Sequence, residues 1–172
     1  FEVDIKKHDL LNDIDQAKQQ LGSTSNASAT AFREAITKAQ EVYDNASATL
    51  ENVMQARVHL AQAAETFAWA NPTGEVPLVT TDSRFARGST MAFARIQVKG
   101  ENIVEQGVCW STSPNPTIRD ERTTEVIQHK GQIYWMKNLL PATCYYIRAY
   151  AITQGKQVGY GDNIKCYTLP KG

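Results

Sequence analysis

Residues 139–151 have the sequence LLPATCYYIRAYA, which carries the strongest structural signal in the chain. After the Pro-containing turn at its start, two sets of side chains alternate with a period of two, the period of a β-strand with one buried face. The inner set is Tyr145, Ile147, Ala149 and Ala151, and the outer set is Tyr146, Arg148 and Tyr150. The stretch therefore predicts a half-buried strand that follows a tight turn.

The segments on both sides of this stretch follow the same pattern. In residues 91–98, Ala92, Ala94, Ile96 and Val98 alternate with Met91, Phe93, Arg95 and Gln97. Turn signals at residues 99–102, 113–116 and 154–156 separate the runs. About seven short strands in roughly 95 residues predict that residues 78–172 form an all-β sandwich.

The first seventy residues contain no Pro, and their apolar side chains recur at helical spacing. Three helices are expected, of which the first ends at Gly22. The second is expected to begin at Ser28 or Thr30 and the third at Thr49, because these residue types favour the N-cap. Short connections make neighbouring helices antiparallel. Residues 1–70 are therefore expected to form a three-helix bundle with an Ala-rich core, only modestly stable by itself.

A linker is expected between the two halves. Residues 71–77 read NPTGEVP, and two prolines and a glycine favour an extended connection over a continued helix. The predicted organisation is a bundle over 1–70, a linker over 71–77 and a sandwich over 78–172, with α and β structure in separate domains.

Net charge is zero, but the two halves differ. Residues 1–70 carry 6 basic and 10 acidic residues, whereas residues 71–172 carry 12 and 8. The basic residues are scattered, which argues against nucleic-acid binding. No apolar run approaches the roughly 18 residues that span a bilayer, so membrane attachment is expected only through an anchor outside this sequence.

Catalytic motifs are absent from the sequence, which has no HExxH, P-loop, GxSxG or GxGxxG. His8, His59 and His129 are far apart and have no carboxylate at metal-ligand spacing. We therefore expect no enzyme activity, no metal and no cofactor.

The candidate binding residues are mostly aromatic. A sugar's apolar face stacks on a flat ring, and neighbouring polar groups fix its hydroxyls. The candidates are Tyr134, Trp135, Tyr146, Arg148 and Tyr150, together with Tyr160. The alternative is that these rings pack against neighbouring strands. Three or more rings in one exposed, coplanar patch would favour binding.

Two other aromatic residues are expected to be structural. Tyr145 closely follows Leu139 and Pro141, the arrangement of a tyrosine corner, in which the hydroxyl bonds back to the backbone. Trp110 has the same phase as Val108, which favours burial over a surface platform.

The three cysteines, Cys109, Cys144 and Cys166, are expected to be reduced and packed as small hydrophobic residues. A disulfide between Cys144 and Cys166 is the alternative, because both lie 11 residues from Gly155, the expected hairpin tip. The alternation of side chains instead places these two thiols on opposite faces of the sheet. One β-bulge would shift the register by a residue and place both thiols on the same face.

Two segments of the second half resemble fibronectin type III-like modules of bacterial surface proteins. They are GVCWSTSPNPT at residues 107–117 and the stretch at residues 139–151, followed by Gly-Tyr-Gly at 159–161. Cys144 departs from the family pattern, which has a small or β-branched residue there. The first half is similar to FIVAR modules, three-helix repeats of secreted glycan-acting enzymes and adhesins. AITKA at 35–39, NASAT at 45–49 and VMQARVHL at 53–60 carry this similarity.

Both resemblances imply an accessory, non-catalytic segment of a larger protein, exported from or displayed on a bacterium. The leading hypothesis is a monomeric N-terminal spacer whose partners are downstream domains of the same polypeptide. The rival is a carbohydrate-binding or adhesive module, with glycans as partners of its exposed aromatic residues.

Overall fold

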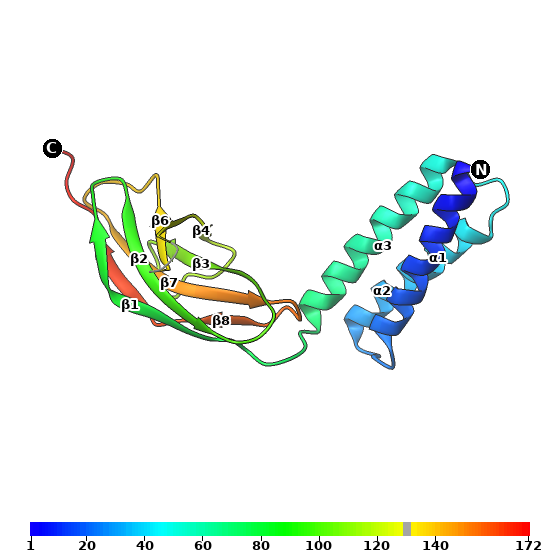
Figure 1. The fold of residues 1–172 in the computed structure, drawn as a ribbon, viewed down its shortest axis with the longest axis horizontal. Coiled ribbons are helices and arrows are strands. Elements are labelled where there is room, and N and C mark those ends of the chain that lie inside the picture. Colours follow the sequence, from blue (N-terminus) through cyan, green and yellow to red (C-terminus); the bar gives the residue numbers. More distant parts are fainter. Residues whose placement is uncertain (129–131) are drawn as a thin grey trace. The chain divides into compact units, whose positions relative to one another are not determined.

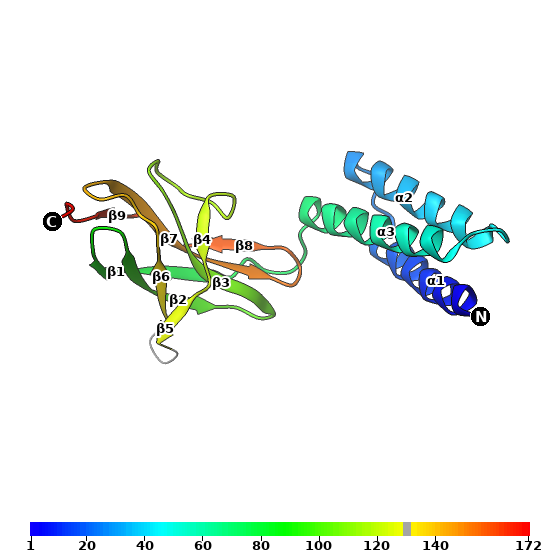
Figure 2. The ribbon, with the colours of Figure 1, turned by 90° about the horizontal axis from the view of Figure 1, so that it is seen from above.

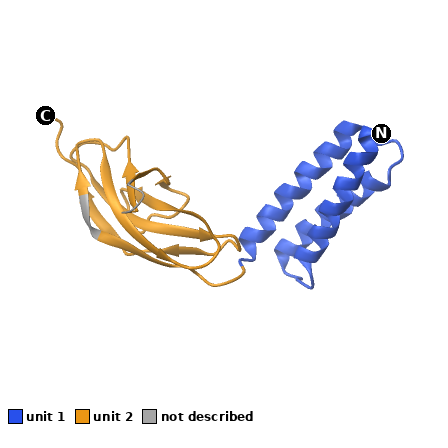
Figure 3. Cartoon of the chain, in the orientation of Figure 1, with its two compact units in different colours: residues 1–72 blue, residues 73–172 orange. Residues whose placement is uncertain are grey.

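The computed structural model describes residues 1–128 and 132–172, without the side chains of residues 83–85 and 128. The chain divides into two compact units, residues 1–72 and residues 73–172 (Figure 3). Unit 1 contains the helices and unit 2 the strands (Figure 1), which confirms the expected fold class. No helix in the described part is long and apolar enough to cross a membrane.

Unit 1 is an antiparallel bundle of α1 (Glu2–Leu21), α2 (Ala27–Asp44) and α3 (Leu50–Ala70). Each helix turns one apolar stripe inward, and the stripes meet in a single core. The Phe32 and Phe67 rings stack there with centroids 4.8 Å apart. Large buried side chains from all three helices complete this core: Leu10, Ile14, Ile36, Val53 and Leu60.

The helix ends show which residues cap the backbone. Gly22 follows α1 with a φ of 52°, a positive value that favours glycine, as expected at this position. Thr49 caps α3 and forms a reciprocal capping box with Asn52. The prediction for α2 was wrong: Asn26 caps it by accepting from the Ala29 N–H, whereas Ser28 and Thr30 lie inside the helix.

Unit 2 is a sandwich of two antiparallel sheets (Figure 2). One sheet has the order β1 (Leu78–Arg87), β2 (Ala92–Lys99), β6 (Ile133–Met136), β5 (Val126–Gln128). The other has the order β4 (Glu121–Thr123), β3 (Ile103–Ser111), β7 (Cys144–Thr153), β8 (Val158–Tyr160), with β9 (Ile164–Tyr167) also paired to β7. The described residues thus form nine strands where about seven were expected. One cause is a break after Tyr160, which splits the last strand in two.

The inner set of β7 packs in the core between the sheets, as its alternation predicted. Tyr145 lies there, and its Oη accepts the Leu140 N–H at 2.9 Å, so the expected tyrosine corner is confirmed. Trp110 is also buried in this core, again as predicted. At the break between β8 and β9, the Thr81 Oγ1 accepts the Ala149 N–H and so satisfies a β7 donor.

The segment Thr73–Pro77 packs against unit 2 ahead of β1. The Thr73 N–H donates to the Gly155 carbonyl at 2.8 Å, and the Gln157 side-chain amide donates to the Gly74 carbonyl at 3.2 Å. A Cβ on Gly155 would collide with the Thr73 backbone, which explains the glycine there. Most of the segment expected to be a linker is therefore bound to the sandwich.

Candidate functional site

The outer face of β7 is largely covered. A loop formed by residues 112–120 leaves β3 and returns over this face, and its Pro116 is buried. Arg148 donates from Nε to the Pro116 carbonyl at 2.5 Å. The Arg148 guanidinium also lies 3.9 Å from the centroid of the Tyr160 ring, and the Tyr160 Oη accepts the Ile118 N–H at 3.0 Å. Arg148 and Tyr160 thus hold the loop in place.

A small buried cluster on the outer face of β7 consists of Cys109, Tyr150 and Ile152. The Tyr150 ring is completely buried, and its Oη donates to the Glu105 carboxylate at 2.7 Å. Burial, followed by this hydrogen bond and the charge of Glu105, raises the pKa of Tyr150, so the phenol stays protonated. Tyr150 is therefore a structural residue of the loop-covered face.

The candidate rings do not form one exposed aromatic patch, because two of them are buried. Tyr134 is in the core, where its Oη accepts from the Gln106 side-chain amide at 2.8 Å, and Tyr150 is under the loop. Tyr146 is half-buried on the outer face, with the Lys165 ammonium 5.7 Å from its ring centroid. Trp135 projects from the other sheet, so the structure does not bring the predicted residues together.

Trp135 is half-buried and lies beside Phe93 of β2, with ring centroids 6.0 Å apart. The Lys137 Nζ is 3.8 Å from the Trp135 ring centroid and 2.7 Å from the Glu125 Oε1. Among the described side chains, the Trp135 Nε1 is a buried donor that has no hydrogen-bond partner. No acceptor among the described residues therefore satisfies this indole N–H.

A cleft of about 490 Å³ lies where the chain crosses from β4 to β5. Its aromatic lining is Trp110, Trp135 and Tyr145, and its polar lining is Glu121, Arg122, Thr123, Glu125, Lys137 and Asn138. Among these residues, only Trp135 was a binding candidate from the sequence. Periodicity identified Trp110 and Tyr145 as core residues. The charged residues of the lining lie in short segments at the ends of strands, and nothing in their spacing in the sequence shows that they line a cleft.

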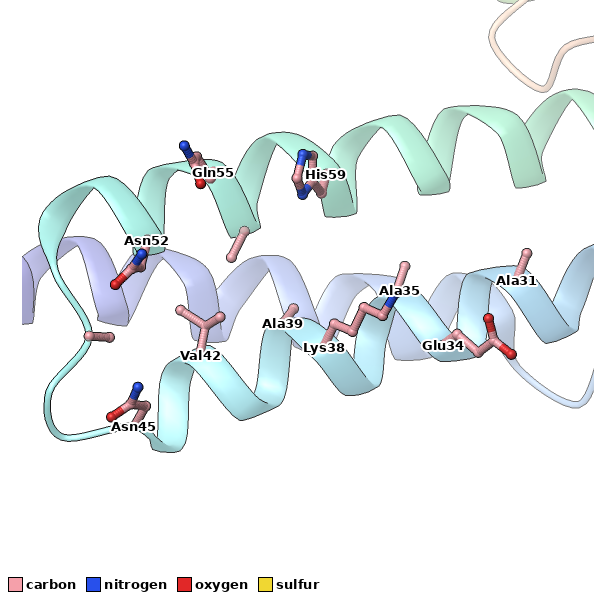
Figure 4. A pocket seen from close by; sticks show the side chains of 12 residues that line it. Ala31, Glu34, Ala35, Lys38, Ala39, Val42, Asn45, Asn52, Gln55 and His59 are labelled. Carbon is pink, nitrogen blue, oxygen red and sulfur yellow. The ribbon is translucent and has the colours of Figure 1, made fainter.

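A second hollow, of about 570 Å³, lies between α2 and α3 (Figure 4). Its lining includes Ala31, Ala35 and Ala39 of α2, with polar side chains such as Glu34 and Lys38 beside them. Alanine side chains are short, so the two helix surfaces leave a shallow groove above the core. The groove follows from the Ala-rich packing of unit 1.

Among the described residues, no three His, Cys, Asp or Glu side chains are grouped to hold a metal ion. His8 and His59 are exposed on helices, and His129 lies outside the described residues.

The cysteines lie at three separate places in unit 2. Cys144 is opposite Tyr167, and Cys166 is opposite Tyr145, so a disulfide would require a different register. Cys166 faces the core and Cys144 the outer side, as side-chain phase predicted. All three thiols are free. Burial raises the pKa of Cys109 from 9.0 to about 11, and burial also raises the pKa of Cys166, which makes both poor nucleophiles.

No protein-family model matches the sequence, and no curated protein matches it. The fibronectin type III domain of human contactin 1 is similar in structure, with 16% identity and a TM-score of 0.45 over 59% of this chain and 82% of that one. A fibronectin type III domain of human fibronectin type III domain containing protein 3 has 13% identity and a TM-score of 0.43, over 58% and 92%. The sixth such domain of that human protein has 24% identity and a TM-score of 0.36, over 59% and 89%. At these scores the likeness adds nothing beyond the sandwich architecture itself.

Proposed function

We propose that this chain is a non-catalytic structural segment that spaces a functional domain of a larger, exported or surface-anchored bacterial protein. The observation that carries the proposal is that the two units close separately. Each has its own core, Asn71 bonds within unit 1 to the Phe67 carbonyl, and Thr73 bonds within unit 2 to Gly155. Only Pro72 lies between these two attachments, so the connection is short.

The use of the outer aromatic residues supports the spacer role over the carbohydrate-binding alternative. Arg148 and Tyr160 fasten a loop, and Tyr134 and Tyr150 are buried. Bacterial origin and a glycan-related parent protein are the finer part of the proposal, which rests on the resemblance of residues 107–117 and 139–151 to surface modules and of unit 1 to FIVAR repeats.

Single-molecule stretching of the chain by its two ends tests the proposal. We expect two separate unfolding events, because a spacer of closed modules yields one module at a time. At 3.3–3.6 Å per extended residue, the two units contain roughly 250 Å and 350 Å of chain. One event that spans the whole chain would contradict two closed modules. Turnover of a polysaccharide by the purified chain, abolished by one substitution, would contradict the non-catalytic part.

A further inference from the structure

The loop of residues 112–120 lies outside the hydrogen-bonded ladders of the sandwich. The ladder between β3 and β7 ends at Ser111, and the ladder between β3 and β4 resumes only at Glu121, so the described ladders leave the loop out. Of the nine side chains in the loop, Pro116 alone is buried and six are exposed. The loop can therefore lift from the sandwich without breaking a strand pair.

Two side chains of the β7 sheet fasten the middle of the loop. Arg148 donates to the Pro116 carbonyl, and the Tyr160 Oη accepts the Ile118 N–H at 3.0 Å. These two side chains also support each other, because the Arg148 guanidinium lies 3.9 Å from the centroid of the Tyr160 ring. Each bond joins one side chain to one backbone group, so neither belongs to the cooperative pairing of a sheet.

Other contacts of the loop are exposed or internal to it. The Asn115 N–H donates to the Asn163 Oδ1 at 3.0 Å in an exposed position. The Thr117 N–H donates to the Asp120 carboxylate at 2.7 Å, and the Asp120 N–H donates back to the Thr117 carbonyl at 2.9 Å. This internal turn can stay folded while the loop lifts. Segments that are held by few buried contacts open locally at a lower free energy than the whole domain.

A thiol that is closed off from solvent lies beneath the loop. The Cys109 side chain is fully buried, and its Sγ donates to the Pro116 carbonyl at 3.5 Å, so Pro116 covers it directly. Burial raises the pKa of this thiol to about 11, which keeps it protonated and unreactive while it is covered. Lifting the loop would return Cys109 to water and to the ordinary reactivity of a cysteine.

We propose that residues 112–120 form a latch that opens while both sheets stay paired, and that the latch switches the Cys109 thiol between a sealed and a reactive state. The thiolate of the open state attacks a small-molecule disulfide, forming a mixed disulfide and releasing the other half of the reagent as a thiolate. Since the interior around Cys109 is close-packed, the added group holds the latch open. This switch does not depend on the spacer role.

Pulse labelling of the whole chain with N-ethylmaleimide tests the proposal, and peptide mass mapping reads Cys109 separately from Cys144 and Cys166. The thiolate adds to the maleimide double bond, and water protonates the neighbouring carbon. The labelling rate is measured in water and in urea below the unfolding transition. We expect the rate at Cys109 to change little with urea, because latch opening exposes little surface, whereas exposure by global unfolding follows the full urea slope.

Two matched variants identify the contacts that break when Cys109 becomes exposed. Tyr160→Phe and Tyr145→Phe each remove one hydroxyl that accepts a backbone N–H. The Tyr160 hydroxyl bonds to Ile118 in the latch, and the Tyr145 hydroxyl bonds to Leu140 outside it. Tyr160→Phe should raise the labelling rate of Cys109 about fivefold, the effect of losing one hydrogen bond. Tyr145→Phe should leave that rate unchanged, although it lowers the denaturation midpoint of the sandwich.

Three results would overturn the proposal. The first is a Cys109 labelling rate that follows the full urea dependence of global unfolding, which includes no labelling before the chain unfolds. The second is an equal acceleration by Tyr160→Phe and Tyr145→Phe, because only unfolding of the whole sandwich breaks both hydrogen bonds. The third is an unchanged rate in Tyr160→Phe, which would show that Cys109 is reached without opening the latch.

Discussion

Tyr145 shows how one residue links sequence to fold. It is the first inward side chain of β7 and pairs in register with Cys166 of β9. Its hydroxyl reaches back to the Leu140 N–H, which fixes the turn that leads into the strand. The turn, the strand start and the core are therefore held by the same ring.

We predict that Tyr145→Phe destabilises the sandwich by about 1 kcal/mol, because a partly buried hydrogen bond is lost and the Leu140 N–H is left without its acceptor. Chemical denaturation followed by a signal from unit 2 measures the change. Tyr146→Phe is the control, because this neighbouring tyrosine lies on the opposite face of β7. Equal midpoints for the two variants would show that the corner contributes nothing.

The register between β7 and β9 makes a prediction for the thiols. At pH 8 a soluble disulfide reagent should react quickly with Cys144, which is half-buried, and slowly with Cys109 and Cys166, which are fully buried. The denatured, unreduced chain should react at all three. A single reactive thiol after denaturation would instead support a bridge, and it would be the Cys144–Cys166 bridge if the reactive residue is Cys109.

The same burial predicts a pH dependence. The folded pKa of Cys109 is about 11, above the 9.0 of an unperturbed thiol, so the unfolded chain loses this proton first as the pH rises. Stability should therefore fall between pH 9 and pH 11, and Cys109→Ala should reduce that fall. Urea denaturation at pH 8 and pH 10 measures it, and equal slopes against pH in both chains would contradict the assignment.

At the scale of elements, the start of α2 shows a limit of reading caps from sequence. Several residues between 25 and 30 have side chains that can cap a helix, and residue type alone does not choose among them. The Asn26 side chain caps α2 and also donates to Asn71 at the end of α3, and the Asn71 side chain in turn donates to the Ser28 hydroxyl. This contact between two helix ends depends on the packed bundle and is invisible in the local sequence.

We predict that Asn26→Ala destabilises unit 1 by about 1 kcal/mol or more, because it removes the cap of α2 and the contact with Asn71. Thr30→Ala, at an exposed position inside the helix, should be neutral or slightly stabilising, since Ala has the higher helix propensity. Thermal unfolding followed by helical circular dichroism compares them. If Thr30→Ala is instead the less stable of the two variants, Thr30 and not Asn26 caps α2.

The outer face of β7 shows a second limit. Alternation predicted correctly which side chains of this strand face the core, because the pleat fixes that pattern. It could not show that residues 112–120 fold over the opposite face and bury Tyr150, because a loop's path depends on contacts such as those of Arg148 and Tyr160. Tyr150 therefore points away from the core, as the alternation predicted, but its ring is not exposed.

For the whole molecule, the architecture was readable because two periods, 3.6 and 2, occupy different halves of the chain. The cleft near Trp135 was not readable, since it combines residues from β3, β4, β6 and β7 with loop residues. Tertiary packing alone brings those segments together. The same packing binds residues 73–77 to the sandwich, although their composition favours a free linker.

We conclude that the chain consists of two units that each form their own core, and differential scanning calorimetry of the intact chain and two core variants checks this. Phe32→Ala removes a stacked ring from the core of unit 1, and Ile147→Ala removes a buried side chain from the core of unit 2. Such truncations cost about 2–5 kcal/mol. We predict two transitions, with Phe32→Ala lowering only the helical one and Ile147→Ala lowering only that of the sandwich. A single transition that both substitutions lower together would contradict the claim.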